Sequence, residues 1–81
     1  MSNLKIHFCE CIKYILTEDR EDLGHTRFTD EQVESFITEH NDTINKIVHE
    51  WNGGENPMWS WMKEELYQRI PVLWELTAEV E

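Results

Sequence analysis

The stretch Asn56-Pro57-Met58-Trp59-Ser60-Trp61-Met62 decides the fold expected of this chain. Asn is a favoured N-cap and Pro is tolerated at the first helical position, so the stretch predicts a helix that begins near Pro57. At ~100° per residue the apolar residues stay on one helical face, and their phase continues past Pro71. This face comprises Met58, Trp59, Met62, Leu66, Ile70, Leu73, Leu76, Thr77 and Val80. Because proline interrupts helical hydrogen bonding, we expect a kink or a split at Pro71, and the common phase favours one kinked helix.

The other side of this predicted helix carries large aromatic residues among carboxylates. Trp61 projects away from the apolar face, together with Glu64, Gln68, Glu75 and Glu79. Tyr67 and Trp74, seven residues apart, form a second line beside it. One interpretation is that the rest of the fold covers these rings, since Trp is usually mostly buried. The other is that they form a surface for a partner or for self-association, where Trp and Tyr are enriched.

A second helix is predicted from the clearest start signal in the chain. Thr29 and Gln32 have the spacing of a capping box, and apolar residues keep one phase from there to Trp51. The following Asn52-Gly53-Gly54 is typical of a helix end. Asn41-Asp42 lowers the helix propensity in the middle and is the place where a break would fall. The continuous phase favours an unbroken helix.

A first amphipathic helix is predicted from residue 3 to about residue 20. Its apolar residues have helical spacing and leave Ile6 exposed. A strand over residues 4–8 is the alternative, but the chain offers no second strand to pair with it. Residues 17–26 are interpreted as a loop, because the acidic group Glu18, Asp19, Glu21 and Asp22 precedes Gly24, a typical left-handed stop.

These segments predict an all-α fold in one domain over residues 1–81. The expected architecture is a small three-helix bundle, with four helices if Pro71 splits the last one. The sequence has no long apolar run and no basic leader before an apolar segment, so we expect a soluble, cytoplasmic protein that does not enter membranes.

The formal net charge is −10, from 17 acidic and 7 basic side chains. Nine acids and four bases lie in residues 1–40, and eight acids and three bases in residues 41–81. The excess is therefore distributed along the chain and predicts a negative folded surface. Such a surface repels phosphates and is attracted to basic clefts, so direct nucleic-acid binding is disfavoured.

Residues that could carry chemistry are few. Cys9 and Cys11 lie too close together in a helix to form a disulfide, and Cys11 is expected in the core. His7 with these cysteines lacks the spacing of a zinc site, and the acidic group lacks the pattern of a calcium loop. His40 is expected as a hydrogen-bonded core histidine. We therefore expect no enzyme, no metal and no cofactor.

The leading hypothesis is a small non-enzymatic inhibitor or adaptor whose acidic surface binds a basic groove of a nucleic-acid-handling protein. Anti-restriction, anti-CRISPR and immunity proteins use this DNA-mimic strategy and serve here as an analogy of class. The alternative is a homodimeric structural or regulatory module whose outward aromatic residues form the dimer interface. The residues predicted to bind the partner are Trp61, Glu64, Tyr67, Trp74, Glu75 and Glu79, with Glu18, Asp19, Glu21 and Asp22 as a second contact.

Overall fold

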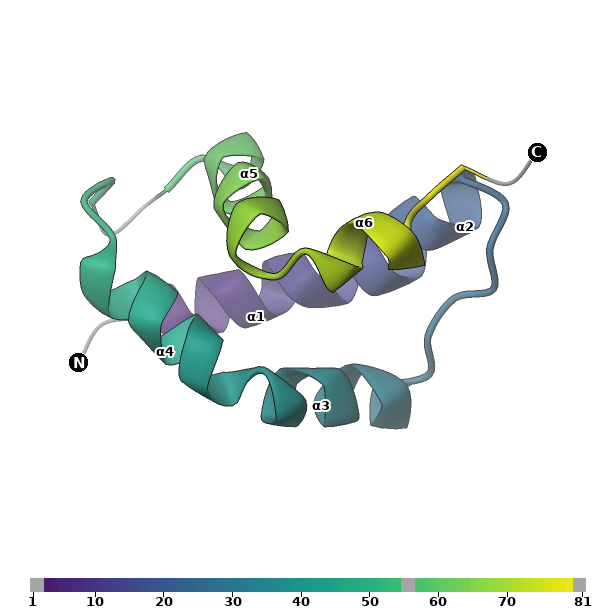
Figure 1. Cartoon of the computed structure of the whole chain (residues 1–81), viewed down its shortest axis with the longest axis horizontal. Coiled ribbons are helices and arrows are strands. Elements are labelled where there is room, and N and C mark those ends of the chain that lie inside the picture. Colours follow the sequence, from purple (N-terminus) through teal and green to yellow (C-terminus); the bar gives the residue numbers. More distant parts are fainter. Residues whose placement is uncertain (1–2, 55–56, 80–81) are drawn as a thin grey trace.

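The computed structural model describes residues 3–54 and 57–79, and within them every regular element is a helix (Figure 1). The elements in chain order are α1 (Leu4–Tyr14), the π-helix η1 (Ile15–Asp19), α2 (Arg20–Asp22), α3 (Asp30–Glu39), α4 (Asn41–Glu50), α5 (Trp59–Arg69) and α6 (Val72–Leu76). The all-α prediction is confirmed. The three-helix bundle is not, because the second and third predicted helices are each divided into two.

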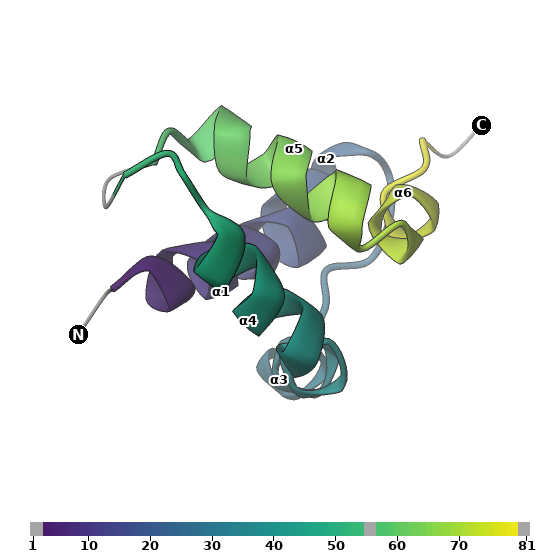
Figure 2. The same cartoon turned by 60° about the vertical axis from the view of Figure 1, so that its left-hand side comes forward.

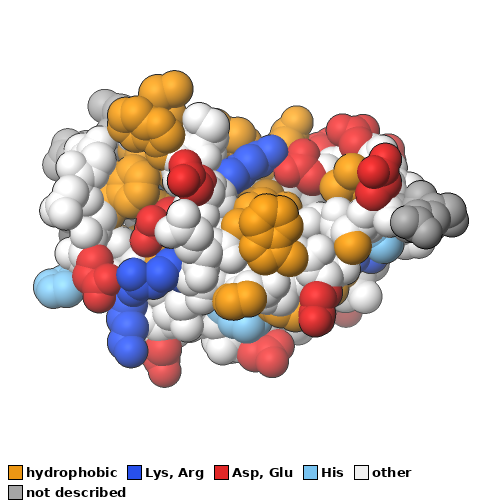
Figure 3. Space-filling view, turned by 45° about the horizontal axis from the view of Figure 1, so that its top comes forward, with side chains coloured by type: hydrophobic (Ala, Val, Ile, Leu, Met, Phe, Trp, Pro, Cys, Tyr) orange, Lys and Arg blue, Asp and Glu red, His pale blue; other side chains and the backbone are white. Residues whose placement is uncertain are grey.

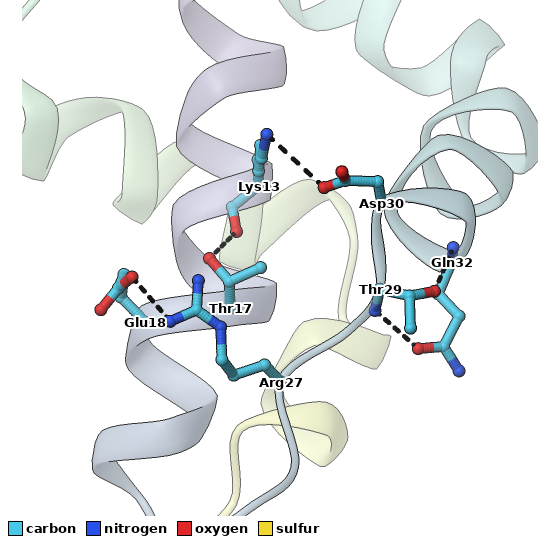
Figure 4. Close-up of polar contacts among 7 residues, drawn as sticks. All are labelled: Lys13, Thr17, Glu18, Arg27, Thr29, Asp30 and Gln32. Carbon is cyan, nitrogen blue, oxygen red and sulfur yellow. Dashed lines mark hydrogen bonds and ion pairs between the residues drawn. The ribbon is translucent and has the colours of Figure 1, made fainter.

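The N-terminal helix is longer than the sequence predicted. α1, η1 and α2 are continuous, since Ile15, Asp19 and Arg20 all have right-handed helical dihedral angles. The prediction of a loop over residues 17–26 was therefore wrong for its first half. The buried hydroxyl of Thr17 donates to the Lys13 carbonyl at 2.7 Å, a contact within the helix that accompanies the π-helical turn (Figure 4). The acidic group thus lies on a helix.

The chain leaves this helix where the sequence indicated. Gly24 has φ 94°, a left-handed conformation that favours glycine. The segment after Gly24 runs back along the helix. A backbone hydrogen bond from the Phe28 amide to the Leu16 carbonyl, at 3.0 Å, attaches it there. Arg27 adds an ion pair to Glu18 at 3.0 Å, which Figure 4 shows beside the start of α3.

The capping box at the start of α3 is confirmed. The Thr29 amide donates to the Gln32 side chain at 2.8 Å, and the Gln32 amide donates to the Thr29 hydroxyl at 3.1 Å (Figure 4). The expected unbroken helix is not observed. His40 leaves the helical conformation (φ −102°, ψ 15°), so that α3 ends and α4 begins around it. The break falls just before Asn41-Asp42, whose low helix propensity gives the physical reason.

Thr29→Ala is expected to lower the free energy of unfolding by about 1 kcal/mol, because it removes the side-chain half of the capping box. Urea denaturation followed by circular dichroism measures this change. Thr38→Ala is the matched control, since Thr38 is an exposed residue within the same helix. Equal losses for the two variants would contradict a specific role of the cap.

The C-terminal helix begins later than predicted and is split. Met58 is extended and α5 begins at Trp59, so the start near Pro57 was wrong; Asn56 lies outside the described residues. At the far end Ile70 leaves the helical conformation (φ −127°, ψ 77°), and Pro71 stands at the N-cap of α6. The proline therefore produces a split, rather than the favoured single kinked helix.

The N-terminal helix runs through the middle of the molecule. Figures 1 and 2 show α3 and α4 along one side of it and α5 across the other, and α1 contacts α3, α4 and α5. The molecule measures 39 × 23 × 18 Å. The shared core consists of Leu4, Phe8, Cys11, Ile12, Ile15, Leu16, Val33, Phe36, Ile44, Ile47, Met62, Leu66, Ile70 and Leu73.

The short helix α6 is attached to the N-terminal helix by polar contacts. Arg20 donates through Nη1 to the Leu76 carbonyl, and His25 Nε2 is hydrogen-bonded to the Ala78 carbonyl. The Arg20 guanidinium also lies 4.8 Å from the centre of the Phe28 ring and donates to the Thr26 carbonyl. These contacts fix where the residues of α6 emerge on the surface.

Candidate protein-binding surface

Exposed aromatic side chains follow one side of α5. Trp59, Lys63 and Tyr67 are spaced four residues apart, so successive members are rotated by only ~40° around the helix. Tyr14 of α1 contacts this line at one end, and Trp74 of α6 contacts it at the other. We call the four aromatic residues Tyr14, Trp59, Tyr67 and Trp74 the aromatic row. Figure 3 views the side where α5 and α6 lie, and shows hydrophobic side chains interleaved with charged ones.

Trp74 is the most exposed member of the aromatic row, with 64% of its surface accessible. Its ring centre lies 4.6 Å from that of Tyr67, which is half-buried. The Tyr67 hydroxyl donates to the Thr77 hydroxyl at 3.0 Å, and the buried Thr77 hydroxyl donates to the Leu73 carbonyl at 2.7 Å. The Tyr67 ring that contacts Trp74 is thus itself hydrogen-bonded to Thr77 at the end of α6. Such preorganisation lowers the entropy cost of using Trp74 as an anchor.

The other end of the aromatic row joins α5 to α1. The Tyr14 and Trp59 rings meet edge to face, with centres 5.7 Å apart and planes at 85°. Lys63 Nζ lies 5.1 Å from the centre of the Tyr14 ring and 2.8 Å from an oxygen of Asp19. Both rings remain accessible, Tyr14 to 42% and Trp59 to 38%.

Trp61 lies on a different side of α5. It is 51% exposed, which favours the second of the two interpretations that the sequence left open, but it follows Trp59 by two residues and so points ~200° away around the helix. Among the described residues no ring contact joins it to Tyr67 or Trp74. The predicted set of aromatic residues is therefore divided between two sides of the helix.

The predicted acidic residues also divide into two groups. Glu18 and Glu21 form ion pairs with Arg27, at 3.0 and 3.6 Å, and Asp19 pairs with Lys63. Their charge is partly neutralised within the fold. The remaining four form no ion pair with any residue in the described ranges, and all are exposed: Asp22, Glu64, Glu75 and Glu79. These four are the members best placed to interact with an external cation.

Two members of the aromatic row were not predicted as site residues. The sequence placed Trp59, with Met58, on the buried face, but Trp59 is partly accessible and Met58 is 56% exposed. The reason is that α5 begins at Trp59, so its first turn extends beyond the core. Tyr14 gave a weak signal, as the one aromatic residue on the polar side of the first predicted helix.

The cysteines and His40, which the sequence offered as candidates for chemistry, are partly or fully buried. Cys9 and Cys11 are free, and burial raises the pKa of both thiols, that of Cys11 to about 12. A thiol of this kind is a poor nucleophile, because the thiolate is the reactive form. His40 is half-buried, with its ring centre 4.4 Å from that of Phe36. Within residues 3–54 and 57–79, no three His, Cys, Asp or Glu side chains are grouped so that they could hold a metal ion.

Comparison with known proteins gives no assignment: no family model, no curated protein and no solved structure matches this chain. In the part of the chain that the structure describes, no helix has the length and apolar character needed to cross a membrane.

Proposed function

We propose that this chain is a small non-enzymatic inhibitor or adaptor that binds a basic, nucleic-acid-binding protein. The observation that carries the proposal is the exposed ring of Trp74, held by Tyr67 and flanked by the unpaired carboxylate of Glu75. An accessible tryptophan that packs against a second aromatic ring is typical of interface hot spots. A net charge of −10 favours a cationic partner and disfavours nucleic acid itself.

The two kinds of side chain have different roles in this proposal. The aromatic row, with Trp61 as a separate contact on the other side of α5, supplies apolar area and slows dissociation. The carboxylates of Asp22, Glu64, Glu75 and Glu79 attract a basic groove and mainly raise the association rate. Glu18, Asp19 and Glu21 contribute less, because Arg27 and Lys63 already neutralise part of their charge. The resulting surface imitates the anionic surface of DNA, as in the anti-restriction and anti-CRISPR analogy.

Affinity capture tests the proposal. The chain is immobilised, nuclease-treated lysate is applied at low salt, and bound proteins are eluted with high salt and identified. A basic nucleic-acid-binding protein is expected, since the screening length falls from ~10 Å at 0.1 M salt to ~3 Å at 1 M. The purified partner must then bind this chain directly, and DNA must compete with it. Captured proteins without a basic excess, or binding that DNA does not displace, would contradict the proposal.

The rival function is a homodimeric module, and it also uses the exposed tryptophans. Sedimentation of the purified chain distinguishes the two. If the chain is an inhibitor or adaptor, we expect a folded monomer at micromolar concentration. The Trp74→Ala variant should remain a folded monomer. A dimer that dissociates and becomes less stable in Trp61→Ala or Trp74→Ala would favour the homodimeric module.

A further inference from the structure

An open groove of about 720 Å³ lies between α3 and α6, apart from the aromatic row. Partly buried or buried side chains form its floor, and exposed polar residues of α3 form its rim. The floor consists of Phe28, Phe36, His40, Val72 and Leu76, and the rim of Thr29, Glu31, Gln32, Ser35 and Glu39. We call it the α3–α6 groove.

The rim of the groove has a regular arrangement. Glu31, Ser35 and Glu39 are spaced four residues apart, so they lie along one side of α3. The two carboxylates are therefore ~12 Å apart along the helix, at 1.5 Å per residue. The small Ser35 between them leaves the middle of the groove open. This length corresponds to about two turns of a helix lying along the floor.

Charge distinguishes this groove from the one between α1 and α3. Among the described residues that line the α3–α6 groove, Glu31 and Glu39 are acidic and none is Lys or Arg. A second groove, of about 540 Å³ between α1 and α3, is lined by both signs, with Lys5 and Lys13 near Glu10 and Asp30. Of these two grooves, which the described residues line, the α3–α6 groove is the one that combines an apolar floor with charge of one sign.

We propose that the α3–α6 groove binds a short amphipathic helix that carries leucine-like side chains on one face and Lys or Arg beside them. The apolar face would lie on Phe36, Val72 and Leu76, and the cations would reach Glu31 and Glu39. This is the helix-in-groove mode of peptide recognition, with charge complementarity along the rim. The proposal does not rest on the proposed function, because it uses none of the residues of the aromatic row.

A designed peptide tests this proposal on the full chain. The probe is a helix of roughly three turns with leucines at helical spacing on one face and lysines on both flanks. Backbone amide NMR shifts locate the site, and fluorescence anisotropy of the labelled peptide gives the affinity. Saturable binding with shifts at Phe28, Phe36, Val72 and Leu76 is expected. The same peptide with alanine in place of leucine must not bind.

Matched charge variants separate specific binding from general attraction to an acidic protein. Glu31→Gln/Glu39→Gln is expected to weaken peptide binding by roughly tenfold, because each exposed carboxylate contributes only modestly to an ion pair. Glu10→Gln/Glu34→Gln removes the same charge from exposed positions outside this groove and is expected to leave binding unchanged. Ser35→Tyr, which fills the middle of the groove, must also weaken binding. Trp74→Ala must not weaken peptide binding. Its effect on binding of the basic partner therefore tests the proposed function separately.

Several results would overturn the proposal. Equal weakening by both charge pairs would mean that the peptide senses only the net charge. Equally tight binding of a peptide whose lysines are replaced by glutamine would make the occupant apolar rather than basic. Shifts confined to the aromatic row would place the site elsewhere. Sedimentation showing self-association through the groove would make a second copy of the chain the occupant.

Discussion

Trp74→Ala is expected to weaken binding of the basic partner by roughly 30-fold or more, corresponding to the ~2 kcal/mol of an interface hot spot. The effect should appear mainly as faster dissociation, because the ring contributes apolar contact rather than long-range attraction. Surface plasmon resonance with the captured partner measures both rates. Glu75→Gln should instead slow association, and its effect should disappear at high salt.

Two controls test whether the effect of Trp74→Ala is specific to the binding surface. Ile6 is 56% exposed on α1 and is not a member of the aromatic row, so Ile6→Ala is expected to leave partner binding unchanged. The thermal midpoint of Trp74→Ala should stay close to that of the parent chain, because most of this ring is already in contact with solvent. A variant that binds the partner as tightly as the parent would exclude Trp74 as the anchor.

Of the proposed substitutions, Phe8→Ala should cause the largest loss of stability, about 3–5 kcal/mol in the free energy of unfolding. Phe8 is fully buried in α1, and its ring meets Trp51 edge to face with centres 5.3 Å apart. The substitution removes a large side chain from the junction between the N-terminal helix and the end of α4. A domain of this length has a total stability of only ~4–12 kcal/mol, so a large part of it would be lost.

Urea denaturation, followed by tryptophan fluorescence and circular dichroism, checks this expectation. Ile6→Ala is again the control, since Ile6 lies on the exposed side of the same helix, and its effect should stay within ~0.5 kcal/mol. A loss below 1 kcal/mol in Phe8→Ala would mean that the core does not depend on this contact.

Local signals in the sequence were sufficient for much of the fold. The Thr29 capping box, the stop at Gly24 and the position of Cys11 in the core were each predicted from neighbouring residues. These features depend on hydrogen bonds or helical phase within a few residues, which a single sequence displays directly. The exposure of Ile6 was predicted for the same reason.

The helix boundaries could not be predicted from such local signals alone. The acidic stretch after Leu16 has the composition of a loop, yet it is helical, and three of its carboxylates pair with Arg27 and Lys63. His40 breaks the second helix although the apolar phase runs through it, so phase alone does not establish continuity. In the first place a helix forms where the composition indicated a loop, and in the second the low helix propensity of Asn41-Asp42 outweighed the periodic pattern.

The candidate surface was predicted in part. The adjacency of Tyr67 and Trp74 followed from their spacing, and their rings are in contact. The pairing of Trp59 with Tyr14 joins two helices separated by more than forty positions in the sequence. Nothing in either helix alone indicates that the other will lie against it.

The hydrogen bond from Arg20 to the Leu76 carbonyl has a consequence for the order in which the protein folds. A helix of five residues is too short to persist in water by itself, so α6 depends on the contacts that receive it. Its anchor lies 56 residues earlier in the chain, on a helix that can form from local interactions. We therefore expect the N-terminal helix to order first and α6 to dock late, so that a nascent chain would present Trp74 in its folded position only after Leu76 has emerged.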